Sequence, residues 1–161
     1  MKSVASLLGA ALLAVGLPAA SAPPDWNADP GAAPLGKRVT VHYSPSCGCC
    51  KHWMAHLERH GFIVERKASG DVAAIKRDAG LKAGETSCHT AFVDGYVIEG
   101  HVPARDIKRL LEVRSDVRGL AVPDMPVGSP GMEMGTRRDA FDVKQLNRDG
   151  TTAVWERYPG N

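Results

Sequence analysis

The sequence predicts a single α/β domain with a mixed β-sheet and helices packed on it, and three observations support this prediction. First, alternating apolar stretches and stretches with helical spacing follow one another as strand, helix, strand, helix, hairpin and helix. Second, three cysteines fall within four residues at the junction of the first predicted strand and the first predicted helix. Third, a segment rich in Met, Pro and Gly leads into a second hairpin signal near the C-terminus.

The first predicted strand and helix flank the cysteine cluster. Apolar residues alternate with polar ones over residues 39–43, as in a half-buried strand, and Pro45 ends this pattern. A helix is expected over residues 51–60, because apolar residues recur there at helical spacing and Gly61 follows as a C-terminal cap. The cysteines therefore open the helix.

The later elements follow from turn and cap signals. Asp71 is a typical helix N-cap, Asp94-Gly95 predicts a tight hairpin turn, and residues 147–150, Asn-Arg-Asp-Gly, predict another. The expected elements are a strand at 62–64, a helix at 72–79, strands at 91–93 and 96–98, a helix around 107–113, a loop at 119–135, and hairpin strands at 141–146 and 151–158.

The N-terminal residues have the pattern of a secretory signal peptide. Lys2 is the only charge before Asp25, and an apolar run leads to Ala20-Ser21-Ala22, a small-residue cleavage pattern. The run is shorter than the ~20 residues that span a bilayer, so cleavage is expected rather than anchoring. We predict a signal peptide over 1–22, a flexible leader over 23–36 and a folded domain over 37–161. The mature protein is then periplasmic, in an oxidising compartment.

The charge balance argues against nucleic acid as a partner and gives no case for binding to an anionic membrane surface. The full chain has 20 Lys and Arg against 18 Asp and Glu, and loss of Lys2 with the signal peptide leaves a net charge of +1. No basic run with interleaved aromatic residues is present in the sequence.

The four cysteines, Cys47, Cys49, Cys50 and Cys88, are the candidate chemical site. A disulfide exchanger needs only an attacking and a resolving thiol, which Cys47 and Cys50 supply. Zinc sites usually space their ligands by two to four residues, and the adjacent pair Cys49-Cys50 fits that pattern poorly. Cu(I) is soft, prefers sulfur ligands and accepts sulfur bridging between ions. The spacing therefore favours a cluster of Cu(I), of more than one ion.

The order of elements, with a C-x-x-C pair at a helix N-terminus, resembles the thioredoxin/glutaredoxin fold. In glutaredoxin-like chains a Val-Pro precedes the hairpin and its cis proline faces the thiol pair. Here Cys88-His89 occupies these two places. The resemblance implies that Cys88 faces the three cysteines of the first loop.

Longer motifs give a closer resemblance, to the CopG-type periplasmic copper-resistance family. It covers nearly the whole chain from about Val39 onward and implies a thioredoxin-like fold, copper binding and ligation by the four cysteines. Asp124 departs from the family pattern, in which glycine is expected. The matching motifs are residues 43–53 (Tyr-Ser-Pro-Ser-Cys-Gly-Cys-Cys-Lys-His-Trp), 87–91 (Ser-Cys-His-Thr-Ala), 93–104, 119–123, and 125–126 through 131–133.

Methionine and histidine are the other candidate ligands. Met125, like Met132 and Met134, lies in the Pro/Gly loop and offers a thioether, a ligand that Cu(I) accepts; the alternative is that these methionines pack the loop. His89 and His101 are expected to tune the site rather than to bind metal. His56 and His60 are expected at surface or capping positions, and Trp53 in the core.

Two functions remain open from the sequence. The first is a periplasmic protein that binds Cu(I) through Cys47, Cys49, Cys50 and Cys88, with Met125 as an extra ligand, for copper resistance or homeostasis. It would act with a periplasmic redox or copper-transfer partner protein, more as a metal-binding protein than as an enzyme. The alternative is a thiol-disulfide oxidoreductase with Cys47 as nucleophile and Cys50 as resolving thiol. In an oxidising compartment the cysteines can also pair, and Cys47–Cys50 with Cys49–Cys88 is one of three pairings.

Overall fold

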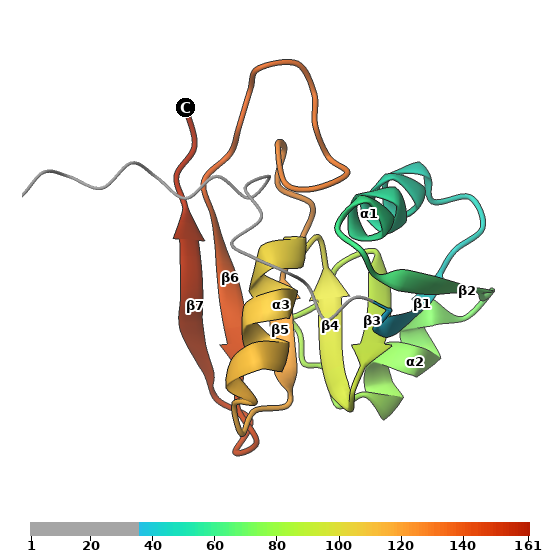
Figure 1. Cartoon of the computed structure of the whole chain (residues 1–161), viewed down its shortest axis with the longest axis vertical. Coiled ribbons are helices and arrows are strands. Elements are labelled where there is room, and N and C mark those ends of the chain that lie inside the picture. The colour runs from blue at the N-terminus through green and yellow to red at the C-terminus, as the bar shows by residue number, and fades with distance from the viewer. Residues whose placement is uncertain (1–35) are drawn as a thin grey trace, which may run out of the picture.

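The computed structural model describes residues 36–161, so the predicted signal peptide and all but the last residue of the predicted leader lie outside the described residues. The described chain forms a seven-stranded mixed sheet with three helices, as Figure 1 shows, which confirms the predicted α/β class. The elements are β1 (Arg38–Tyr43), α1 (Gly48–Arg59), β2 (Ile63–Ala68), α2 (Val72–Asp78), β3 (His89–Val93), β4 (Tyr96–Gly100), α3 (Ala104–Val113), β5 (Gly119–Val122), β6 (Phe141–Leu146) and β7 (Thr152–Tyr158).

The strands are ordered β2-β1-β3-β4-β5-β6-β7. β1 runs parallel to β2 and antiparallel to β3, β3 is antiparallel to β4, and β4 is parallel to β5. The arrangement of the first four strands is compatible with the expected thioredoxin/glutaredoxin-like topology. The C-terminal hairpin extends the sheet, because β6 pairs with β5 and β7 with β6 in antiparallel fashion.

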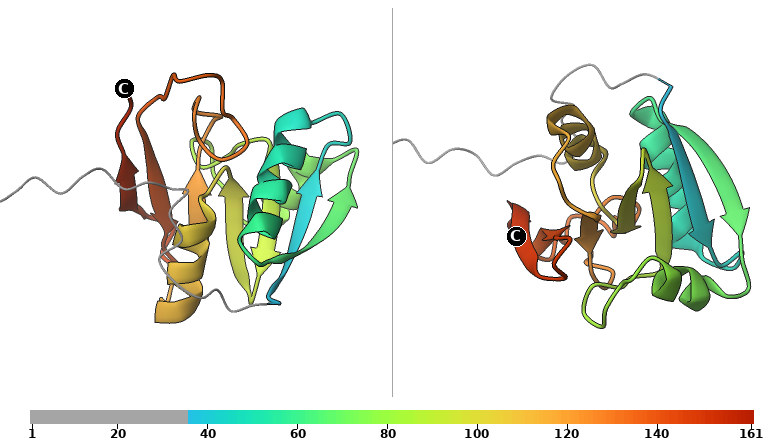
Figure 2. Two further views of the ribbon diagram at one scale, coloured as in Figure 1. Left: turned by 45° about the horizontal axis from the view of Figure 1, so that its top comes forward. Right: turned by 90° about the horizontal axis from the view of Figure 1, so that it is seen from below.

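Helices cover both faces of the sheet. Helices α1 and α3 lie on one face and α2 on the other, as the second view of Figure 2 shows. The core between α1, α3 and the sheet holds fully buried apolar side chains from each layer, among them Val41, Trp53, Leu57, Ile98 and Ile107. Trp53 also donates its indole N–H to the carbonyl of Val102 at 2.9 Å. Its expected place in the core is confirmed.

The predicted loop at 119–135 begins instead with strand β5. The residues of β5 are all buried, and the strand pairs with β4 on one side and β6 on the other. A Cβ on Gly119 would lie 1.7 Å from the carbonyl oxygen of Val97, so only glycine fits this close approach of two strands. A four-residue strand between glycine and proline shows no period in the sequence, which is why it was predicted as loop.

The C-terminal hairpin is also tied to helix α3. Tyr158 donates its hydroxyl to the buried carboxylate of Asp106 at 2.6 Å, and the Trp155 indole N–H lies 3.2 Å from the same carboxylate. Arg109 forms an ion pair with Glu156 at 3.0 Å. These contacts cross from helix to strand and fix the hairpin at the sheet edge.

His56 was predicted at a surface or capping position; it is fully buried, and it caps a helix other than its own. Helix α3 starts at Pro103, which has no capping side chain. The Nε2 atom of His56, on α1, instead accepts the N–H of Ala104 at 3.0 Å. Burial, together with the nearby cations His60, Arg59 and Lys108, lowers the pKa of His56 to about 3. A neutral imidazole thus joins the two helices.

The loop after β5 extends past the ends of the strands and packs against the first turns of α1 (Figure 1). Gly131 has a φ of +84°, and a Cβ there would lie 2.6 Å from the backbone nitrogen of Trp53 and 3.0 Å from the carbonyl oxygen of Cys49. The same loop places the carbonyl of Pro130 next to His101. The contact therefore fixes the loop where the cysteines open the helix.

Gly131→Ala is expected to destabilise the protein much more than Gly135→Ala. Both glycines have positive φ, which costs an added side chain about 1 kcal/mol, but a Cβ on Gly135 contacts nothing within 4 Å. The clash at Gly131 with α1 should add roughly 1–3 kcal/mol. Urea denaturation measures both free energies of unfolding. Equal losses would show that the loop does not press on α1.

His56 should make the fold sensitive to acid. Because the pKa of His56 is lowered to about 3 in the folded state, its contribution is complete above the unfolded pKa of 6.5 and is lost as pH falls toward 3. At pH 5 the loss should be about 2 kcal/mol.

Urea denaturation at several pH values should therefore show a flatter stability profile between pH 7 and 4 for His56→Gln, whose amide oxygen can still accept the Ala104 N–H. His52→Gln, an exposed position on the same helix, should keep the wild-type profile. Parallel profiles for all three proteins would contradict the assignment.

Candidate metal centre

The cysteine loop is shaped by the start of helix α1. After β1 ends, the N–H of Cys47 binds the carbonyl of Ser44 at 2.9 Å, and Cys47 becomes the N-cap of the helix. Its Sγ accepts the backbone N–H of Cys50 at 3.3 Å. Gly48, Cys49 and Cys50 form the first helical residues, so the helix begins three residues before the predicted Lys51. The sulfur atoms of all three cysteines are therefore held at a helix N-terminus, where the thiolate form of a free cysteine is favoured.

Cys88 faces this loop, as the resemblance to glutaredoxin-like chains implied. It directly precedes β3, which pairs with β1 so that Tyr43, the last residue of β1, lies opposite His89. The Sγ of Cys88 lies 3.5 Å from that of Cys50 and 3.7 Å from that of Cys49. The four cysteine sulfur atoms all lie within 4.8 Å of one another.

The adjacency of Cys49 and Cys50 does not separate their sulfur atoms. The sequence argument against zinc rested on the adjacency of Cys49 and Cys50, but in the structure helix geometry and the facing Cys88 bring both sulfurs into one group. The geometry alone therefore suits any thiolate-binding metal. Soft thiolate ligands of this kind suit Cu(I) and Zn(II) alike.

Two of the four cysteines are joined. Cys47 and Cys50 form a disulfide, whereas Cys49 and Cys88 are free thiols. Of the two disulfides in the pairing considered from the sequence, Cys47–Cys50 is thus present. Cys49–Cys88 is absent, although the two sulfur atoms are neighbours. In this state the group offers two thiols, and reduction would supply two more.

Cys88 holds its proton tightly in the absence of a cation. Burial, and then the nearby Cys49 thiol, raise the pKa of Cys88 to about 12. A cation at this sulfur would displace the proton, since thiolate is the form that binds metal.

Two buried histidines contact the same sulfur. The Nδ1 of His89 and the Nε2 of His101 each lie 3.2 Å from the Sγ of Cys88, and both residues are fully buried. Burial lowers the pKa of both imidazoles, so they are neutral. His101 also donates its Nδ1–H to the carbonyl of Pro130 at 2.7 Å.

Sequence reasoning noticed these histidines but not their convergence. His89 follows Cys88 directly, and His101 follows the end of β4, whose pairing with β3 brings both to one end of the sheet. The signal available in the sequence was a Cys-His pair before one hairpin strand and a histidine just after the other.

A buried carboxylate supports the segment that carries Cys88. Glu99 on β4 is fully buried and accepts the N–H of Ser87 at 2.7 Å and the hydroxyl of Thr90 at 2.6 Å. Lys76 on α2 pairs with it at 2.5 Å. Ser87 and Thr90, which flank Cys88-His89, are therefore both bound to the Glu99 side chain. The sequence analysis missed this role of Glu99. Its signal was a single charge within the apolar run of β4.

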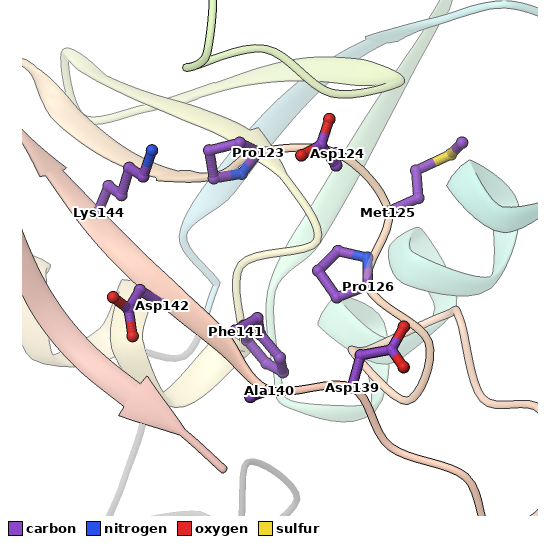
Figure 3. A pocket seen from close by; sticks show the side chains of 9 residues that line it. All are labelled: Pro123, Asp124, Met125, Pro126, Asp139, Ala140, Phe141, Asp142 and Lys144. Atoms are coloured by element: carbon purple, nitrogen blue, oxygen red, sulfur yellow. The ribbon is translucent and has the colours of Figure 1, made fainter. Parts of the chain in front are cut away.

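Met125 lies on the surface beside this segment. Its side chain is 49% exposed and lines a surface pocket with Asp124, Asp139 and Asp142 (Figure 3). Asp124, its neighbour, receives the Ser87 hydroxyl on its carbonyl and has a φ of +59°, a conformation that favours glycine. This explains why glycine is expected there in the family pattern. Met134 is 65% exposed and Met132 is half-buried.

Within residues 36–161, no helix is long and apolar enough to cross a bilayer.

Comparisons with known proteins place this geometry in a family. Residues 85–132 match a family model described as "Protein of unknown function, DUF411". No curated protein matches the chain. A solved structure titled "Copper resistance protein copG- Form 2" is 48% identical, covers 77% of this chain and 99% of its own, and superposes with a TM-score of 0.75. A second, titled "Copper resistance protein copG- Form 1", is 50% identical, with coverage of 76% and 98% and a TM-score of 0.73. At this identity and coverage, the chain belongs to the copG family of copper resistance proteins.

Proposed function

We propose that this protein is a periplasmic copper-binding protein that holds Cu(I) in a cysteine-thiolate cluster, for copper resistance or homeostasis. The observation that carries the proposal is the convergence of four cysteine sulfurs within 4.8 Å of one another. Thiolates from one loop and one facing strand end form a compact all-sulfur group. Such a group suits a soft monovalent ion, and the copper resistance titles of the two similar structures support copper.

The sulfur arrangement favours more than one ion. Cys49 lies between its partners, with its Sγ 3.4 Å from that of Cys47 and 3.7 Å from that of Cys88. A sulfur in this position can bridge two copper ions, and Cu(I) accepts the low coordination numbers that result. Met125 directly follows Asp124, whose carbonyl accepts the Ser87 hydroxyl. From this position it would supply an additional thioether ligand at the margin of the four-cysteine group.

Copper loading of the whole group requires reduction. The Cys47–Cys50 disulfide must accept two electrons and two protons, and an external dithiol supplies both by thiol-disulfide exchange, becoming a disulfide itself. The two thiols released then bind copper as thiolates and lose their protons. A periplasmic dithiol protein would fit this role, and a second partner would donate or receive copper.

Cys49→Ser should distinguish copper clustering from disulfide exchange. We expect reduced wild-type protein, kept without oxygen and offered Cu(I) and Zn(II) together, to retain more than one copper per chain and to consume all four thiols. Cys49→Ser should lose at least half of that copper, because the bridging sulfur is gone. Metal analysis with a thiol count measures both.

Gly48→Ala is the matched control, since it lies in the same turn and a Cβ there contacts nothing within 4 Å. It should load copper like the wild type. The opposite result has two parts: neither the wild type nor the control retains copper, and the Cys47–Cys50 disulfide forms and breaks reversibly in both the wild type and Cys49→Ser. The protein would then be a thiol-disulfide oxidoreductase instead.

Copper uptake should depend on the redox state of the protein. Chain carrying the Cys47–Cys50 disulfide lacks two of the four sulfur ligands and should bind fewer copper ions than chain treated with a dithiol. Copper per chain, measured after gel filtration of oxidised and of reduced protein, tests this. The same stoichiometry in both would refute redox-dependent loading.

A further inference from the structure

We infer that the surface pocket lined by residues 123–126 and 139–144 is a docking site for the dithiol protein that reduces the Cys47–Cys50 disulfide, and that it receives a lysine or arginine side chain of this partner. The inference rests on the proposed function, because copper loading of all four cysteines requires that reduction. It adds the place where the partner binds and the chemistry that recognises it.

The disulfide is open to a partner at Cys47. Cys50 is fully buried, whereas Cys47 is partly exposed. A thiol of the partner therefore attacks the Sγ of Cys47 and displaces that of Cys50, which takes up a proton. The partner's second thiol then breaks the mixed disulfide, so the partner leaves as a disulfide and the chain gains two electrons and two protons. Gly48, next to Cys47, has open space where a side chain would lie, which leaves room for the partner.

The pocket borders the sulfur group through the segment that carries Cys88. The N–H of Asp124 donates to the carbonyl of Thr86 at 3.1 Å, and the carbonyl of Asp124 accepts the Ser87 hydroxyl. The Sγ of Cys88, the next residue, lies within 4.8 Å of that of Cys47. A protein interface of standard size covers about 800 Å² on each partner, which is enough to reach from Cys47 across the pocket.

The pocket combines apolar walls with a net negative lining. Its volume is about 610 Å³, enough for a long side chain. The rings of Pro123, Pro126 and Phe141 form apolar walls, and Figure 3 shows three carboxylates around them. The charged lining residues are these three carboxylates and one lysine: Asp124, Asp139, Asp142 and Lys144.

Two of the carboxylates are available to a partner. Asp139 already accepts the N–H of Val127 at 3.1 Å and pairs with Arg137 at 2.9 Å. Asp142 has a long contact of 3.7 Å to Arg157, and the exposed carboxylate of Asp124 has no partner among the described residues.

Lysine and arginine match this combination of walls and charges. They lay their methylene stems on apolar surface and keep the charged end at polar groups, here the carboxylates of Asp124 and Asp142. An acidic side chain of a partner would instead meet like charge, which disfavours binding. Charge complementarity therefore selects a basic residue beside the partner's thiols.

The test uses three dithiol peptides of the form X-Gly-Gly-Cys-Gly-Gly-Cys-Gly-Gly-X, in which X is arginine, glutamine or glutamate. Each reacts with the full chain carrying its Cys47–Cys50 disulfide. Alkylation stops the reaction, and mass spectrometry follows the rise from two to four alkylated cysteines per chain. We expect the arginine peptide to react roughly fivefold faster than the glutamine peptide, and the glutamate peptide to be the slowest.

The double variant Asp124→Asn with Asp142→Asn should lower the arginine-to-glutamine rate ratio to about 1–2. Asparagine tolerates the positive φ of 59° at Asp124. Glu112→Gln with Asp116→Asn is the matched control, because it removes the same charge before β5, at the opposite end of the strand from the pocket. The control should keep the wild-type ratio, and uncharged dithiothreitol should reduce all three proteins at the same rate.

Equal rates for the three peptides with the wild type would overturn the inference, as would a double variant that keeps the wild-type ratio. If circular dichroism shows that the double variant does not fold, NMR of the wild type with an arginine peptide carrying serine for cysteine decides. Amide shifts at residues 123–126 and 139–144 support the docking site, and shifts confined to other residues refute it.

Copper per chain of the reduced wild type is measured in parallel. Copper retention without charge selectivity refutes the docking site only. Charge selectivity without copper retention refutes the proposed function only.

Discussion

The antiparallel pairing of β1 with β3 is the constraint on which the candidate metal centre depends. It sets Tyr43 opposite His89. Cys47, which follows β1 after a short turn, and Cys88, which directly precedes β3, therefore meet at one end of the sheet. Without this register, Cys88 would be a single thiol far from the others. Helix α1 completes the arrangement by winding three cysteines into its N-cap and first turn, where free backbone N–H groups favour thiolate.

The surrounding structure holds this junction rigid with buried polar groups. Glu99 fixes the backbone of Ser87 and the side chain of Thr90, on either side of the Cys88-His89 pair. Pro130 orients His101 from the loop that Gly131 packs against α1. Each of these groups is costly to bury unless its hydrogen bonds are made. These hydrogen bonds surround the segment that carries Cys88 and therefore fix the direction in which its thiol points.

The sequence predicted the elements with strong local signals and missed those that tertiary contacts create. The C-x-C-C loop, the Asp71 cap and the Asp94-Gly95 hairpin were predicted because cap and turn chemistry is local. β5 was missed because four residues show no period, and its strand state comes from pairing on both sides. The role of His56 was missed for a similar reason, since its partner Ala104 lies on another helix. The facing position of Cys88 was predictable only through the resemblance to glutaredoxin-like chains, and the two histidines around it required the three-dimensional structure.

Anomalous diffraction at the copper edge is the most direct test of whether the four cysteine thiolates converge to bind copper. Crystals of dithiol-reduced protein loaded with Cu(I) should show two or more copper peaks bridged by the sulfur atoms of Cys47, Cys49, Cys50 and Cys88. The density should also show the Cys47–Cys50 bond broken, because both sulfurs are then ligands. Copper peaks away from these sulfurs, or none at all in reduced and loaded crystals, would contradict the account.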